Sequence, residues 1–115
     1  MIKRKAGYPV KENENMRGGE GVVVIESLLT PDELYEKGRL LAKVTLAPGC
    51  SIGHHVHEGE MESFFIICGE GEVSDNGEIV KVSADDTILT KSGESHSIKN
   101  IGSTTLEMIA LILYK

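Results

Sequence analysis

The sequence contains no tryptophan and only two cysteines, and aromatic residues make up 4% of its 115 residues. Two cysteines cannot supply the network of bridges on which small secreted domains depend. No apolar run approaches the roughly 20 residues that a membrane-spanning helix needs. Basic residues are outnumbered, with 12 Lys and Arg against 18 Asp and Glu, which gives a formal net charge of −6. We therefore expect no binding to membranes or to nucleic acid, whose phosphates require a positive protein face.

Glycine, by contrast, is frequent, with 13 residues, and short apolar runs alternate with turn signals along the chain. This pattern is typical of an all-β sandwich or barrel, and 115 residues are enough for one domain but not for two. Three of the first five residues are basic, but no apolar stretch follows them, so we expect a solvated terminus and not a secretory signal. We expect a cytoplasmic protein with free thiols.

The chain divides into an N-terminal arm, residues 1–17, and a β-barrel, residues 18–115, which belong to the same domain. The arm is polar and is expected to be extended. Thr30 has the properties of a helix N-cap, with proline at the first helical position and glutamate at the third, and Gly38 offers a C-terminal stop. These signals predict one short helix over Pro31–Lys37.

The remaining elements are expected to be strands. An Asp-Asn-Gly sequence at residues 75–77 predicts a tight hairpin between two of them. The predicted strands cover residues 22–25, 39–46, the segment around the His-x-His sequence, and residues 64–68, 71–74, 78–82, 87–91, 96–100 and 105–113.

Four residues from two distant segments have the spacing of one metal centre. His55 and His57 are two residues apart, so on a strand they share a face and can bind one ion. Glu62 follows a polar connection and opens an apolar strand, where an inward carboxylate is costly unless a cation compensates it. His96 is proposed as the fourth ligand. Three imidazoles and a carboxylate suit Mn, Fe, Co, Ni or Zn.

Other histidine and acidic residues nearby have simpler explanations. His54 lies off the shared face and is expected to be a surface residue. Glu60 is the competing carboxylate for the metal. Glu58, Glu60 and Glu94 are interpreted as solvated charges at the rim of the site.

These residues carry a resemblance to the cupins, in particular to small single-domain type-2 cupins of the oxalate decarboxylase-like and germin-like superfamily. The first cupin motif is matched in full by Gly49, His55, His57, Glu62 and Gly69. The second is matched at Gly93, His96 and Asn100. The sequence departs from this second motif at Asp85, where the family has glycine, and at Lys91, where the family has proline. Both positions shape a turn. The resemblance spans roughly residues 40–113, supports Glu62 and His96 as ligands, and implies a jelly-roll β-barrel.

The resemblance also implies a function. Four protein ligands on one divalent transition metal (Mn, Fe, Ni or Zn) leave two positions open for a bidentate ligand. We expect a metal-dependent enzyme of the decarboxylase, dioxygenase or isomerase type that acts on a small, anionic, oxygen-rich acid such as oxalate or a 2-oxo or 2-hydroxy acid. The alternative is a non-catalytic module that binds or senses a sugar or an organic acid. No catalytic residue is assigned, because the faces on which Lys43 and Thr45 lie cannot be read from the sequence.

Strand alternation also places the two cysteines. Cys68 has the parity of Glu62 and is expected to point inward as a buried hydrophobe, with a nucleophilic role as the alternative. Cys50 is expected to point outward, so that the two could not form a bridge.

We further expect a homodimer, because a small barrel has exposed strand edges that need covering. The proposed contact is arm exchange or edge pairing around Val22–Ile25.

Overall fold

The computed structural model describes residues 1–115 and contains ten β-strands. The strands are β1 (Val10–Glu14), β2 (Val22–Leu29), β3 (Gly38–Leu46), β4 (Ser51–Val56), β5 (Glu60–Cys68), β6 (Glu70–Asp75), β7 (Glu78–Ser83), β8 (Thr87–Thr90), β9 (Ser95–Asn100) and β10 (Leu106–Tyr114). Two short 3-10 turns, η1 (Lys5–Gly7) and η2 (Met16–Gly18), precede β2. The prediction of an all-β fold is confirmed.

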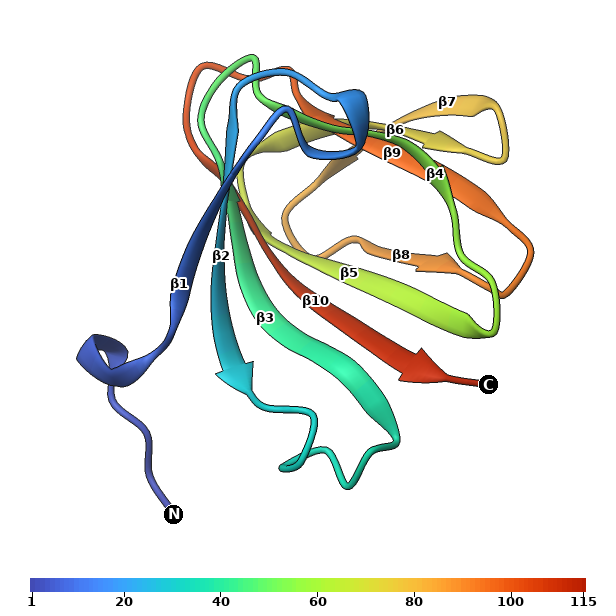
Figure 1. The fold of residues 1–115 in the computed structure, drawn as a ribbon. Helices are drawn as coiled ribbons and strands as arrows, with labels where there is room; N and C mark the ends of the chain where they lie inside the picture. The colour runs from blue at the N-terminus through green and yellow to red at the C-terminus, as the bar shows by residue number, and fades with distance from the viewer.

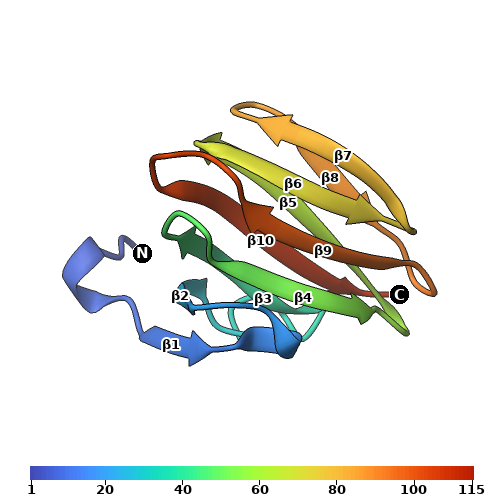
Figure 2. The ribbon, with the colours of Figure 1, turned by 90° about the horizontal axis from the view of Figure 1, so that it is seen from above.

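The strands form two antiparallel sheets that face each other (Figure 1). The larger sheet has the order β1-β2-β3-β10-β5-β8, and the smaller has the order β4-β9-β6-β7, as the view from above shows (Figure 2). From β3 onward the chain passes repeatedly from one sheet to the other, which is the jelly-roll pattern expected from the sequence.

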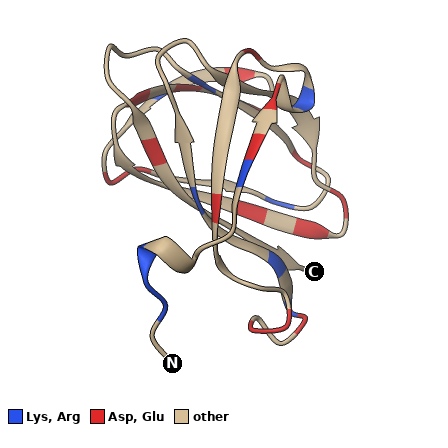
Figure 3. Ribbon diagram, turned by 60° about the vertical axis from the view of Figure 1, so that its left-hand side comes forward, with Lys and Arg blue, Asp and Glu red and all other residues tan.

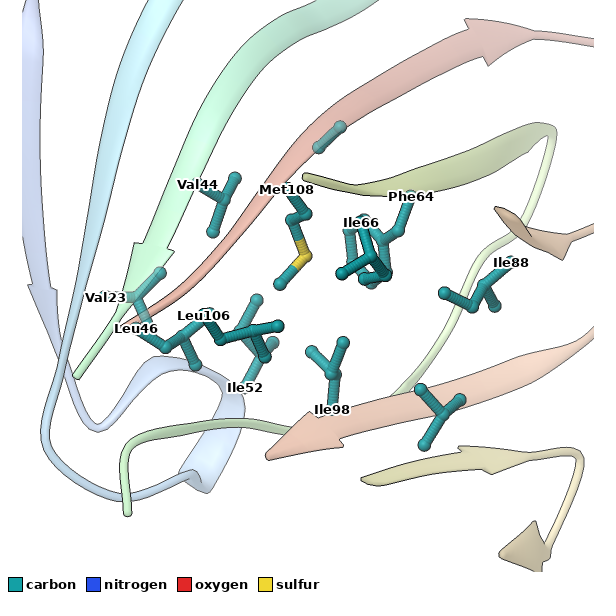
Figure 4. Close-up of a cluster of buried hydrophobic side chains, with 12 residues drawn as sticks. Val23, Val44, Leu46, Ile52, Phe64, Ile66, Ile88, Ile98, Leu106 and Met108 are labelled. Carbon is teal, nitrogen blue, oxygen red and sulfur yellow. The ribbon is translucent and has the colours of Figure 1, made fainter. Parts of the chain in front are cut away.

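A single apolar core fills the space between the sheets (Figure 4). Alternate residues along each strand supply it, as on β10, where every second side chain from Leu106 to Ile112 is buried. The inward row of β5 contains Phe64 and Ile66, and that of β9 contains Ile98. Polar residues continue these same rows toward one end of the sandwich, and they form the site described below.

The predicted helix over Pro31–Lys37 is wrong, because this segment is a series of turns. The expected capping contacts do form: the Glu33 amide donates to Thr30 Oγ1 at 3.2 Å, and the Thr30 amide donates to the Glu33 carboxylate at 2.9 Å. The helix does not propagate, since Tyr35 and Glu36 have φ of 54° and 56°. Tyr35 is 83% exposed, so the segment has no apolar face whose burial would offset the cost of starting so short a helix.

The N-terminal arm is more ordered than its composition suggested. Residues Val10–Glu14 form β1, which pairs with β2 through Lys11↔Ile25 and Asn13↔Val23. The prediction that Val22–Ile25 pairs with the edge of a second chain is therefore wrong, since the chain's own β1 covers that edge. Arm exchange stays a prediction. The edge strands of the larger sheet are β1 and β8.

Both cysteines are free, as predicted, but the directions expected for them were wrong. Cys68 is exposed, because a bulge lets Glu107 pair with Cys68 while Met108 pairs with Ile66, which breaks the alternation at the end of β5. Cys50 precedes β4, so strand parity does not apply to it, and it packs half-buried against the core.

No helix in the structure combines the length and the apolar character required to cross a membrane.

Candidate metal centre

Three strands bring the four predicted ligands together at one end of the sandwich. His55 lies near the end of β4 and pairs with His96 of the neighbouring β9. His57 follows β4 directly and has the same parity as His55. Glu62 lies on β5, in the facing sheet. The side chains of these residues are only 1–9% exposed.

The donor atoms of the four side chains converge on one point. The Nε2 atom of His96 lies 3.0 Å from that of His55 and 3.1 Å from that of His57. The nearer Glu62 carboxylate oxygen lies 2.9 Å from Nε2 of His57, 3.0 Å from that of His96 and 4.0 Å from that of His55. All four donor atoms lie within 4.8 Å of one another.

The five separations of 2.9 to 4.0 Å are close to those in the ligand shell of a single transition metal ion. Ligand atoms about 2.1 Å from one ion lie about 3.0 Å apart when they meet at a right angle and about 4.2 Å apart when they are opposite. His55 and Glu62 have the longer separation, whereas His57 and His96 have right-angle separations from Glu62. The four residues could therefore hold a metal ion.

Each imidazole presents Nε2 to the centre because its Nδ1 has another partner. Nδ1 of His55 donates to the Gly53 carbonyl at 2.8 Å, and Nδ1 of His57 donates to the Glu60 carboxylate at 2.7 Å. Nδ1 of His96 lies 2.8 Å from Thr90 Oγ1. A neutral imidazole that donates from Nδ1 has a lone pair on Nε2, so the Nε2 lone pairs of His55 and His57 point into the centre. Lone pairs held in this way are suited to bind a cation.

Glu60 supports the centre and is not the solvated rim charge that was expected. Besides His57, its carboxylate binds Arg39 through two hydrogen bonds of 2.8 and 2.7 Å. The Arg39 guanidinium, followed by His57, lowers the Glu60 pKa from 4.5 to about 2, and the carboxylate in turn raises the Arg39 pKa. Burial lowers the His55 pKa below 6.5, which favours the neutral, metal-binding form. The spacing of three residues between His57 and Glu60 was the only sequence signal for this contact.

Other residues of the sequence motifs have structural roles. Asn100 is buried, donates to the carbonyls of Leu46 and Thr104, and accepts from the Gly102 amide. Asp85 has φ of 74°, a left-handed conformation that explains why glycine is usual at this motif position.

The remaining candidates lie away from the centre. His54 and Glu58 are exposed, as expected. Glu94 accepts from the Lys91 amide and from the Asn76 side chain, and thereby closes a turn. Lys43 forms an ion pair with Glu107, and it and Thr45 alternate with the buried residues of β3, so both face outward. Neither can act as an acid or base at the metal centre.

A cavity of about 300 Å³ opens onto the candidate ligands from between the sheets. Phe64 forms one wall, where its ring stacks on His96 at a centroid distance of 5.1 Å. The cavity is lined by Lys11, Asn13, Met16, Arg17, Ile25, Ser27, Arg39, Leu40, Val44, Ile52, His55, His57, Glu62, Phe64 and Ile112.

Comparison with known families agrees with this fold and site. The cupin domain family model matches residues 42–112. The chain belongs to the cupin family. This cupin is 45% identical over 113 residues to an oxalate-binding protein of Thermotoga maritima, an alignment that covers 98% of this chain and 93% of the relative.

Solved structures show the same similarity. The crystal structure of a predicted oxalate decarboxylase from Thermotoga maritima matches this cupin with a TM-score of 0.96 and 44% identity, over the whole of both chains. A cupin domain from Schizosaccharomyces pombe matches with a TM-score of 0.75 and 20% identity, over 92% of this chain and 69% of that one, and shows the shared fold alone.

Proposed function

We propose that this cupin binds one divalent transition metal ion (Mn, Fe, Ni or Zn) and uses it to hold a small oxygen-rich dicarboxylic acid such as oxalate. The observation that carries the proposal is the convergence of three buried Nε2 atoms and one carboxylate oxygen on a single point. The ligands would be His55, His57, Glu62 and His96. When bound, the ion would supply Lewis acidity and two coordination positions for the acid's oxygens.

An anionic ligand is favoured by the charges of the site itself. The four protein ligands contribute one negative charge, so a divalent ion would leave the site positive. Acidic residues are spread over both sheets, and the chain carries a net charge of −6 (Figure 3). The long-range field therefore opposes anions, and any preference for them must arise inside the cavity. The name of the oxalate-binding relative from Thermotoga maritima agrees with this ligand class.

Turnover of the bound acid is the second candidate. It is favoured by the similarity to a predicted oxalate decarboxylase. Against it, Glu62 is the one carboxyl that lines the cavity and it is a candidate ligand, so a proton for turnover would have to come from Lys11 or from solvent. Binding without turnover is therefore the function that the geometry supports better. Incubating the metal-loaded protein with labelled oxalate and measuring formate separates the two candidates.

Thermal unfolding tests the binding proposal. Oxalate should raise the melting temperature of the metal-loaded protein and leave that of the metal-free protein and of the His57→Ala variant unchanged. If neutral sugars stabilise the loaded protein and oxalate does not, this is a sugar-binding cupin.

We also propose a cytoplasmic location for this protein. The two free thiols agree with it, because thiols stay reduced in that compartment.

A further inference from the structure

Two cationic side chains at the mouth of the cavity have no acidic partner. Lys11, Arg17 and Arg39 line the cavity that contains the candidate metal ligands. Arg39 is neutralised by Glu60. Lys11 and Arg17 form no ion pair and no side-chain hydrogen bond. Both side chains are therefore free to attract an anion that enters this cavity.

The register of β1 directs Lys11 to the cavity. Lys11 pairs with Ile25, and Ile25 pairs with the core residue Val44, so the three lie in one row across the inner face of the larger sheet. All three line the cavity. Glu12 and Glu14 alternate onto the opposite face of β1 and are absent from the lining.

Close packing of η2 against β4 fixes the backbone at Arg17. The Ser51 amide donates to the Glu20 carbonyl at 2.8 Å, and the Glu20 amide donates to Ser51 Oγ at 2.9 Å. The Arg17 carbonyl lies so close to Gly53 that a β-carbon at position 53 would overlap it, and a β-carbon at Gly19 would overlap the Ser51 carbonyl. Glycine at both positions allows the contact.

We infer that Lys11 and Arg17 form an anion subsite that makes this cupin prefer doubly charged over singly charged acids. The inference rests on the proposed metal-dependent binding of a small acid. Oxalate and glycolate can both chelate an ion through two oxygens of adjacent carbons, but oxalate carries one more negative charge. The attraction to the two cations is proportional to the ligand charge, so it favours oxalate.

The test compares oxalate and glycolate by calorimetric titration of the metal-loaded protein and of two double variants. Lys11→Gln/Arg17→Gln removes the subsite, whereas Arg4→Gln/Lys5→Gln removes the same charge from exposed arm positions outside the cavity. Removing the subsite should weaken oxalate binding roughly tenfold and glycolate binding roughly threefold, because exposed charges contribute little each and the monoanion gains half as much. Metal content should not change, and the control pair should bind both acids like the wild type.

Further measurements make the result specific. Each single variant, Lys11→Gln and Arg17→Gln, should show part of the oxalate loss, and raising the salt concentration should reduce the preference of the wild type for oxalate. Unchanged oxalate affinity in the metal-loaded Lys11→Gln/Arg17→Gln variant would overturn the subsite and leave the proposed function intact. An equal loss in the control pair would also overturn it. Failure of the metal-loaded wild type to bind either acid would overturn the proposed function as well.

Discussion

Nδ1 of His57 lies 2.7 Å from the Glu60 carboxylate, and this contact directs Nε2 of the same ring to the candidate metal position. The carboxylate is itself held by Arg39 through two hydrogen bonds, so the imidazole is oriented by a chain of two residues, Glu60 on β5 and Arg39 on β3 of the same sheet. Carboxylates that accept from metal-binding histidines fix the ring orientation and increase its basicity.

Glu60→Ala should therefore weaken metal binding about 10- to 100-fold, measured by competition with a chelator. Glu60→Gln should have an intermediate effect, because its amide oxygen can still accept from His57. Glu58→Ala is the matched control, since Glu58 is exposed and has no side-chain partner. Equal metal affinity in Glu60→Ala and Glu58→Ala would show that Glu60 does not orient the ligand.

The low pKa of Glu60 predicts a pH-dependent stability of the metal-free protein. Because its pKa falls from 4.5 to about 2 on folding, the ionised carboxylate stabilises the fold. This contribution is complete above about pH 4.5 and is lost as the pH falls through 2. In urea unfolding, the gap in unfolding free energy between wild type and Glu60→Gln should be largest near neutral pH and shrink toward pH 2. A gap that stays constant over this range would contradict the assignment.

Gly53 connects the N-terminal segment to the metal centre. Its carbonyl accepts from Nδ1 of His55, and the Arg17 carbonyl occupies the position of a β-carbon. Gly53→Ala should destabilise the protein by about 1–3 kcal/mol and weaken metal binding, because either η2 or His55 must shift. Gly7→Ala, which meets no atom within 4 Å, is the control. Chemical denaturation measures the loss of stability, and chelator competition measures the loss of metal affinity. If neither changes in Gly53→Ala, this contact does not support His55.

We predict that this cupin is a homodimer that uses the outer face of its larger sheet. Phe65, Ile67 and Leu89 are 38%, 41% and 45% exposed on neighbouring strands β5 and β8. Burying such a face in a two-fold contact would remove apolar area from water. Light scattering should give about 25 kDa, twice the chain mass of 12.5 kDa. Phe65→Lys should shift the protein to monomer, whereas Ile79→Lys on the other sheet should not. A monomeric wild type at micromolar concentration would refute the dimer.

Local alternation made most of the fold predictable from the sequence. On β5 and β9, every second side chain points inward, as the sequence pattern predicted. These inward rows place Glu62 and His96 in line with the core. The His-x-His spacing predicted two candidate ligands on one face for the same reason. Metal binding by the four residues remains a prediction, but the structure brings them together as the spacing indicated.

The features that were missed depend on partners far away in the sequence. The bulge that exposes Cys68 arises from the register with β10. The roles of Glu60 and Lys11 depend on Arg39 and on the pairing of β1 with β2. At Pro31–Lys37 the local capping contacts form as predicted, but no helix forms, because the segment has no apolar face to bury.

Elemental analysis of the purified protein tests the central claim most directly. Wild type and His54→Ala, which replaces the exposed histidine next to His55 in the sequence, should each carry about one transition metal ion per chain. The His55→Ala/His57→Ala variant should lose most of it while its circular dichroism still shows a folded β protein. Full retention of the metal in that double variant would contradict the assignment of these residues as ligands.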